Sequence, residues 1–132
     1  MYQPIGKYGI IGDTQTAALV SSSGSIDWLC LPHFDSAAVF LRLLDGAKGG
    51  YCAVEPENVV AATRRYPEGT NILETTFETG SGVLVVTDFM PVRDRRGAHP
   101  LGQDVATEFT GTWMPTMGGQ AGKERLPLAR FG

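Results

Sequence analysis

Alternating apolar and polar positions recur in short runs along residues 8–90, and turns rich in glycine and proline separate them. The alternation has a period of two, which is typical of a β-strand with one buried face. The clearest runs are 71–79 and 83–90, which the glycine-rich loop 80–82 joins as a hairpin. The remaining runs predict an edge strand at 8–12 and further strands at 16–20, 26–31, 51–54 and 58–66.

The strand predicted at 26–31 has two unlike faces. Ile26, Trp28 and Cys30 form a wholly apolar face, whereas the opposite face begins with the carboxylate of Asp27. Asp27, a carboxylate on a strand next to a tryptophan, is therefore a candidate functional residue.

The chain should leave this strand at Pro32, because proline has no backbone N–H for a sheet. It would then turn outward through 33–35, His-Phe-Asp. Ser36 lies where a helix N-cap is expected, and a short helix is predicted over 36–45 from the apolar residues at helical spacing, namely Val39, Phe40, Leu43 and Leu44.

Six or seven short strands and one short helix predict an all-β protein, a partial antiparallel β-sandwich. Such a partial sandwich would leave sheet edges and an apolar face uncovered. We therefore expect self-association through the open edges.

Three blocks resemble a known family and span about residues 2–92: IGDTQTAALVSSS, GSIDWLCLPHFDSAAVFLRLLD and RRYPEGTNILETTFETGSGVLVVTDFMP. Together they resemble the N-terminal domain of bacterial glucoamylase- and trehalase-type glycoside hydrolases of family fifteen. The resemblance implies a β-sandwich that, in the full-length parent, packs on a catalytic barrel of paired helices and helps to shape the substrate entrance. It also places two catalytic glutamates in that barrel.

On this resemblance, residues 2–92 are a truncated first domain without catalytic residues. The parent would act in carbohydrate metabolism and hydrolyse an α-glucosidic bond in trehalose or in a malto- or isomalto-oligosaccharide. Two other hypotheses stay open at this point: a free-standing β-sandwich that binds carbohydrate or protein without turnover, and a gene fragment without function.

Residues 93–132 differ in composition from the preceding part. They are rich in Gly, Pro and Arg, carry six basic and four acidic side chains, and show neither strand nor helix periodicity for long. Residues 1–92 carry five basic and ten acidic side chains. The tail is expected to be irregular or disordered, either as a real extension or as the product of a shifted reading frame.

Length and charge limit the other classes of function. A chain of 132 residues with 42% hydrophobic residues has room for one domain, and a net charge of −3 provides no basic surface for nucleic acid. No apolar run approaches the roughly 20 residues of a membrane helix, and the first residues lack a signal-peptide pattern, so a cytoplasmic protein without membrane contact is expected. The spacing Gly6, Gly9, Gly12 is no dinucleotide fingerprint, because no strong strand precedes it and no helix follows, and no cofactor is expected.

The two cysteines, Cys30 and Cys52, are expected to be buried thiols rather than a disulfide in a chain without a secretory signal. Cys30, His33 and Asp35 are too few and too isolated for a zinc site, and nothing ties His33 to a thiol. No metal is therefore expected.

The candidate substrate-binding residues lie around Pro32. Sugar rings pack on aromatic faces while their hydroxyls bind carboxylates and other polar groups, so an α-glucosidic sugar would bind at Asp27, Trp28, His33, Phe34 and Asp35. The structural alternatives are that Trp28 belongs to the core and that His33 is an ordinary loop residue. Family members carry arginine where His33 stands, which weakens the comparison at that position.

Overall fold

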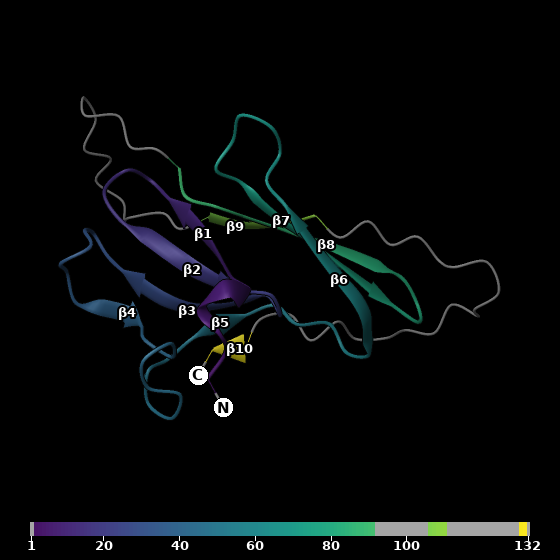
Figure 1. Ribbon diagram of the computed structural model, residues 1–132, viewed down its shortest axis with the longest axis horizontal. Coiled ribbons are helices and arrows are strands. Elements are labelled where there is room, and N and C mark those ends of the chain that lie inside the picture. Colours follow the sequence, from purple (N-terminus) through teal and green to yellow (C-terminus); the bar gives the residue numbers. More distant parts are fainter. Residues whose placement is uncertain (1, 92–105, 111–129, 132) are drawn as a thin grey trace.

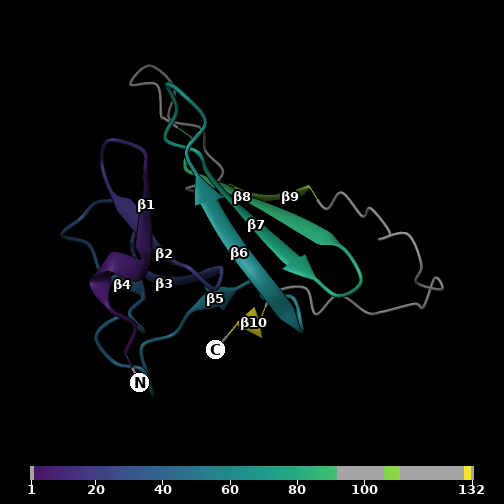
Figure 2. The same ribbon diagram turned by 45° about the vertical axis from the view of Figure 1, so that its right-hand side comes forward.

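Two antiparallel sheets make up the computed structural model, which describes residues 2–91, 106–110 and 130–131. Figure 1 shows the two sheets, and in the turned view of Figure 2 they form separate layers whose strands cross at an angle. The first sheet has the order β1-β2-β3-β5-β10, with β4 also paired to β3. Its strands are β1 (Tyr8–Gly12), β2 (Ala17–Ser21), β3 (Ser25–Cys30), β4 (Ala38–Phe40), β5 (Cys52–Ala53) and β10 (Arg130–Phe131).

The second sheet has the order β6-β7-β8-β9. Its strands are β6 (Val59–Arg65), β7 (Leu73–Thr79), β8 (Val83–Phe89) and β9 (Ala106–Thr110). The predicted hairpin is confirmed, since β7 pairs with β8 in the register Phe77↔Leu84. A short 3-10 helix, η1 (Ile5–Lys7), precedes β1. The all-β antiparallel class is confirmed, and each of the seven predicted strands has a counterpart.

The helix predicted over 36–45 is wrong. Ala38–Phe40 form β4, an eighth strand within residues 8–89, and the chain then turns. The N–H groups of Leu41 and Arg42 donate to the carbonyls of Gly49 and Gly50, so they are not available for a helix. A Cβ at Gly49 would collide with the Leu41 backbone, which makes glycine necessary for this close approach.

A β-bulge in β3 rearranges the faces that alternation predicts. Val20 pairs with Ile26, but Leu19 pairs with Trp28, so β3 contains one extra residue, Asp27, opposite β2. Ile26 and Leu29 consequently lie in the same apolar core, although strict alternation puts them on opposite faces. This core lies between the sheets and contains Ile11, Ala18, Val20, Ile26, Leu29, Leu73 and Met90.

A second contact joins the sheets at the edge strand β1. The Tyr66 hydroxyl accepts a hydrogen bond from the Ile10 N–H at 2.9 Å and donates one to the Ile10 carbonyl at 2.8 Å. Asn71 donates to the Gly12 carbonyl at 2.8 Å. Gly9 allows the approach, because a Cβ there would be 2.8 Å from Leu73 Cδ2. The edge of β1 is thus covered by residues of the segment that connects β6 to β7.

Three sequence expectations concern the rest of the chain. Cys30 and Cys52 are free thiols, as predicted, the first buried and the second half-buried. In the described part of the chain, no helix combines the length and apolar character needed to cross a membrane. Most of the tail 93–132 lies outside the described residues. Its two described segments are strands: β9 pairs with β8, and β10 pairs with β5. The domain boundary near residue 92 stays a prediction.

Candidate functional site

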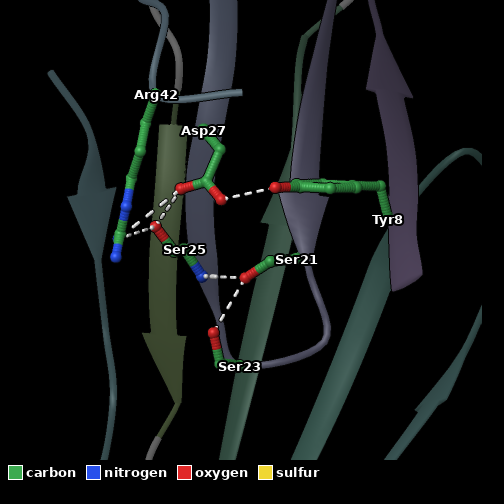
Figure 3. Close-up of polar contacts among 6 residues, drawn as sticks. All are labelled: Tyr8, Ser21, Ser23, Ser25, Asp27 and Arg42. Carbon is green, nitrogen blue, oxygen red and sulfur yellow. Dashed lines mark hydrogen bonds and ion pairs between the residues drawn. The ribbon is translucent and has the colours of Figure 1, made fainter. Parts of the chain in front are cut away.

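Asp27 is the centre of a polar cluster on the first sheet (Figure 3). Its residue is 4% exposed, and its Oδ2 accepts a hydrogen bond from the Tyr8 hydroxyl at 2.8 Å. Its Oδ1 accepts one from the Ser25 hydroxyl and lies 3.8 Å from Arg42 Nη1. Tyr8 belongs to β1 and Asp27 to β3, so the phenol reaches across β2, the strand between them.

Serines at the ends of β2 and β3 and in the turn between them position the hydroxyl that donates to Asp27. The Ser21 hydroxyl accepts the Ser25 N–H at 3.1 Å and lies 2.9 Å from the Ser23 hydroxyl. Arg42 Nη1 also donates to the Ser25 hydroxyl at 3.4 Å. These bonds hold the Ser25 side chain in position to donate to Asp27.

The Tyr8 phenol and the Arg42 guanidinium, the two partners of the Asp27 carboxylate, are each affected by their surroundings. Burial, followed by the hydrogen bond to Asp27 and its charge, raises the pKa of Tyr8 to about 12, and Arg42 opposes the rise. Tyr8 therefore remains a neutral hydroxyl donor at neutral pH. The Arg42 guanidinium lies over the Tyr51 ring, 4.0 Å from its centre, which fixes its plane.

A cavity of about 310 Å³ opens beside this cluster. Its polar lining residues include Asp27, Arg42 and Tyr8, and the N-terminal segment and the 42–47 turn form the remaining wall. The other lining residues are Tyr2, Gln3, Ser23, Asp45, Gly46 and Ala47. The cavity therefore combines two carboxylates, a guanidinium, an amide, hydroxyls and an exposed aromatic ring, a mixture suited to hydrogen bonding a polar ligand.

The structure places one of the five predicted site residues at the cavity. Asp27 lines the cavity, whereas the other four do not. Trp28 and Phe34 stack on each other with ring centres 6.3 Å apart and an interplanar angle of 28°. Phe34 is 58% exposed and Trp28 is half-buried, so this tryptophan is not a core residue. His33 and Asp35 are exposed in the loop after Pro32.

Asp27 is the one lining residue that the sequence indicated, and Tyr8 and Arg42 are the two direct partners of Asp27 that it missed. Arg42 was hidden in the predicted helix, and Tyr8 is the first residue of an edge strand whose neighbours are not visible from the sequence. The Tyr-Gly pair at 8–9 offered a weak signal, because a glycine next to an aromatic residue permits close packing.

Among the buried carboxyl groups outside the cavity, that of Asp88 has a shifted pKa. Asp88 on β8 is 3% exposed, and within the described residues its Oδ2 has no hydrogen-bond partner. Burial raises the pKa of Asp88 to about 6. The Cys52 thiol also has a raised pKa, because of its burial and then the nearby charge of Asp88. The described residues contain no group of three His, Cys, Asp or Glu side chains that could hold a metal ion.

Comparison with known proteins gives matches along most of the chain. Residues 1–112 match a family described as trehalase-like, N-terminal. Trehalases from Thermoplasma volcanium, Mycolicibacterium smegmatis and Thermoplasma acidophilum are 47%, 46% and 49% identical over 93, 88 and 76 residues. These alignments cover 68%, 66% and 55% of this chain, but only 15%, 13% and 13% of the three relatives. No solved structure matches.

Proposed function

The chain belongs to the family of trehalase-like N-terminal domains, and we propose that it acts as the non-catalytic N-terminal domain of a trehalase-type glycoside hydrolase. The observation that carries the proposal is that relatives named trehalases match this chain closely over only about one seventh of their length. The remaining part of such a protein would supply the catalytic helical barrel. The substrate of the whole hydrolase would be an α-glucosidic sugar, and trehalose is the first candidate.

The chemistry of the cavity supports binding rather than hydrolysis. Glycoside hydrolysis normally uses two carboxyl groups, one on each side of the scissile bond. Asp27 and Asp45 both line the cavity, but Asp27 is held by Tyr8 and Ser25, and Asp45 Oδ1 accepts the N–H groups of Ala47 and Lys48 at 3.0 and 3.1 Å. Neither carboxylate is arranged as a free acid or nucleophile.

Exposed apolar side chains support a role beside a larger domain. Phe34 and Val39 are 58% and 49% exposed, and Phe34 is stacked on Trp28. The N–H of His33 donates to the Ser36 hydroxyl at 3.1 Å, and the Ser36 N–H donates to the His33 carbonyl at 3.1 Å, so the loop that carries Phe34 is held in shape. Rigid exposed aromatics are typical of the centres of protein interfaces.

A domain exchange tests the proposal. The segment of the Thermoplasma volcanium trehalase that aligns with this chain is replaced by the corresponding residues of this chain, and trehalose hydrolysis is measured. We expect kcat/KM to stay within about tenfold of the parent, because the two segments are 47% identical over 93 residues. The same trehalase lacking the segment is the control, and it should lose soluble, active protein.

The isolated 132-residue chain should not hydrolyse trehalose or maltose. Turnover by the purified chain would contradict the non-catalytic assignment. An exchanged protein that is well folded but a thousandfold less active would contradict the domain assignment.

A further inference from the structure

The cavity beside Asp27 has hydrogen-bonding capacity that the protein itself does not use. Each carboxylate oxygen has two lone-pair positions, and each Asp27 oxygen accepts one hydrogen bond within the described residues. The Arg42 guanidinium has five N–H donors, of which one donates to Ser25 at 3.4 Å. At 3.8 Å, the Arg42–Asp27 pair is an ion pair without a direct hydrogen bond.

We propose that this cavity, lined by Asp27, Arg42, Tyr8 and Tyr2, binds an uncharged polyhydroxy ligand, a mono- or disaccharide. A sugar hydroxyl is both a donor and an acceptor, so one hydroxyl, or two adjacent ones, can donate to Asp27 and accept from Arg42. The carboxylate and the guanidinium are already fixed by Tyr8, Ser25 and Tyr51, so binding would order few side chains.

The wall of the cavity that faces solvent provides an aromatic surface. Tyr2 is 64% exposed and its hydroxyl is 3.4 Å from the Leu44 carbonyl, which holds the ring beside the 42–47 turn. Apolar C–H faces of a sugar ring pack on such rings. A volume of about 310 Å³ is at the lower end of the range for small-molecule sites, and it suits one or two sugar rings rather than a long chain.

The charge of the cavity excludes anionic ligands. Asp27 and Asp45 line it together with one cation, Arg42, so its ionised side chains are net negative. A phosphorylated sugar would bring a second anion against a buried carboxylate, which is unfavourable. The site therefore selects neutral sugars over sugar phosphates.

The test is a titration of the 132-residue chain with sugars, in which calorimetry or the NMR shifts of Tyr and Arg side chains report binding. Trehalose and maltose should bind saturably with dissociation constants on the order of 0.1–10 mM, typical of a small open site. Glucose 6-phosphate should bind at least tenfold more weakly than glucose. Only the choice of α-glucosidic disaccharides rests on the proposed function.

Variants locate the binding. Arg42→Gln should weaken sugar binding at least tenfold, and its matched control is Arg65→Gln, an arginine on β6 that pairs with Glu74 outside the cavity. Arg42 also packs on Tyr51, so Tyr2→Ala, at an exposed position, provides a second variant that should weaken binding without loss of fold. Circular dichroism checks the fold of each variant.

Three results would overturn the inference: no saturable binding by the folded chain up to about 100 mM sugar, equal binding by Tyr2→Ala and Arg65→Gln, or tighter binding of glucose 6-phosphate than of glucose. The domain exchange reports separately. An active exchanged trehalase together with a chain that binds no sugar would contradict this inference and leave the proposed function standing. An inactive, well-folded exchanged trehalase together with a chain that binds sugar would contradict the proposed function and leave this inference standing.

Discussion

At the scale of single residues, hydrogen-bond partners distinguish two buried carboxylates that look alike in the sequence. Asp27 and Asp88 both lie on strands and are both almost inaccessible to solvent. Asp27 has hydroxyl donors and a nearby arginine, whereas Asp88 Oδ2 has no partner among the described residues. An unpartnered buried carboxylate is costly when ionised, so burial raises the pKa of Asp88 above its ordinary value in the folded chain.

Asp88 should therefore make the chain less stable as pH rises. Its folded-state pKa of about 6 lies above the ordinary 3.8, so its stabilising contribution is complete below about pH 4 and is lost as pH rises through 6. Asp88→Asn should raise the free energy of unfolding by roughly 2–3 kcal/mol at pH 7.5 but by only about 1 kcal/mol at pH 4.5, where much less of the Asp88 contribution has been lost. Thermal unfolding of both proteins between pH 4 and 8 measures this difference.

The matched control is Asp35→Asn, which neutralises an exposed carboxylate and should leave the difference near zero at every pH. A constant difference between Asp88→Asn and the parent chain across the whole pH range would contradict the assignment.

At the scale of elements, the period of two was sufficient to predict seven strands, most clearly β7, where Leu73, Thr75 and Phe77 are buried on one face. It failed at 36–45, where the apolar spacing fits a helix as well as it fits a strand followed by a turn. The decision depends on partners distant in sequence: Leu43 donates its N–H to the Asp27 carbonyl, and Arg42 donates to Gly50. Single-sequence periodicity contains no such information.

The site was predictable only in part for the same reason. Asp27 was identified from its residue type beside Trp28, but the bulge that turns it toward Tyr8 and away from the Trp28–Phe34 pair is a feature of strand pairing. Tyr8 and Arg42 are 19 and 15 positions from Asp27 in sequence, and only the β1-β2-β3 order and the 41–50 turn bring them together.

The covered edge of β1 gives a prediction for Tyr66→Phe. The substitution removes the hydroxyl that satisfies both the N–H and the carbonyl of Ile10. We expect a loss of about 0.5–1.5 kcal/mol in the free energy of unfolding, since the two backbone groups exchange the hydroxyl for water at an exposed position, and a greater tendency to associate through the uncovered edge. Urea unfolding and light scattering measure the two effects.

Tyr51→Phe is the control for Tyr66→Phe, because it also removes a phenolic hydroxyl but leaves the ring under Arg42 in place. Equal stability of Tyr66→Phe and the parent chain would show that water replaces the hydroxyl without cost.

At the scale of the whole molecule, the two sheets differ in how their first strands are protected. β1 is covered by Tyr66 and Asn71, whereas β6 pairs only with β7 in the described part of the chain and is 42% exposed at Val59 and 77% at Val60. An open strand with apolar side chains pairs readily with a second chain. In a longer protein, another segment would cover such a strand.

The isolated chain should therefore self-associate through β6. Sedimentation velocity at increasing concentration should show dimers or larger species, and Val60→Lys should shift the distribution toward monomer, because a charge on an edge strand opposes pairing. Val60 is exposed, so the substitution should change the free energy of unfolding by less than about 0.5 kcal/mol.

Leu44→Lys, at an exposed turn position, introduces the same charge outside the sheets and should not reduce association. A chain that stays monomeric at all concentrations would mean that β6 is protected, and association unchanged by Val60→Lys would place the contact on another surface, of which the Trp28–Phe34 pair is the first to examine.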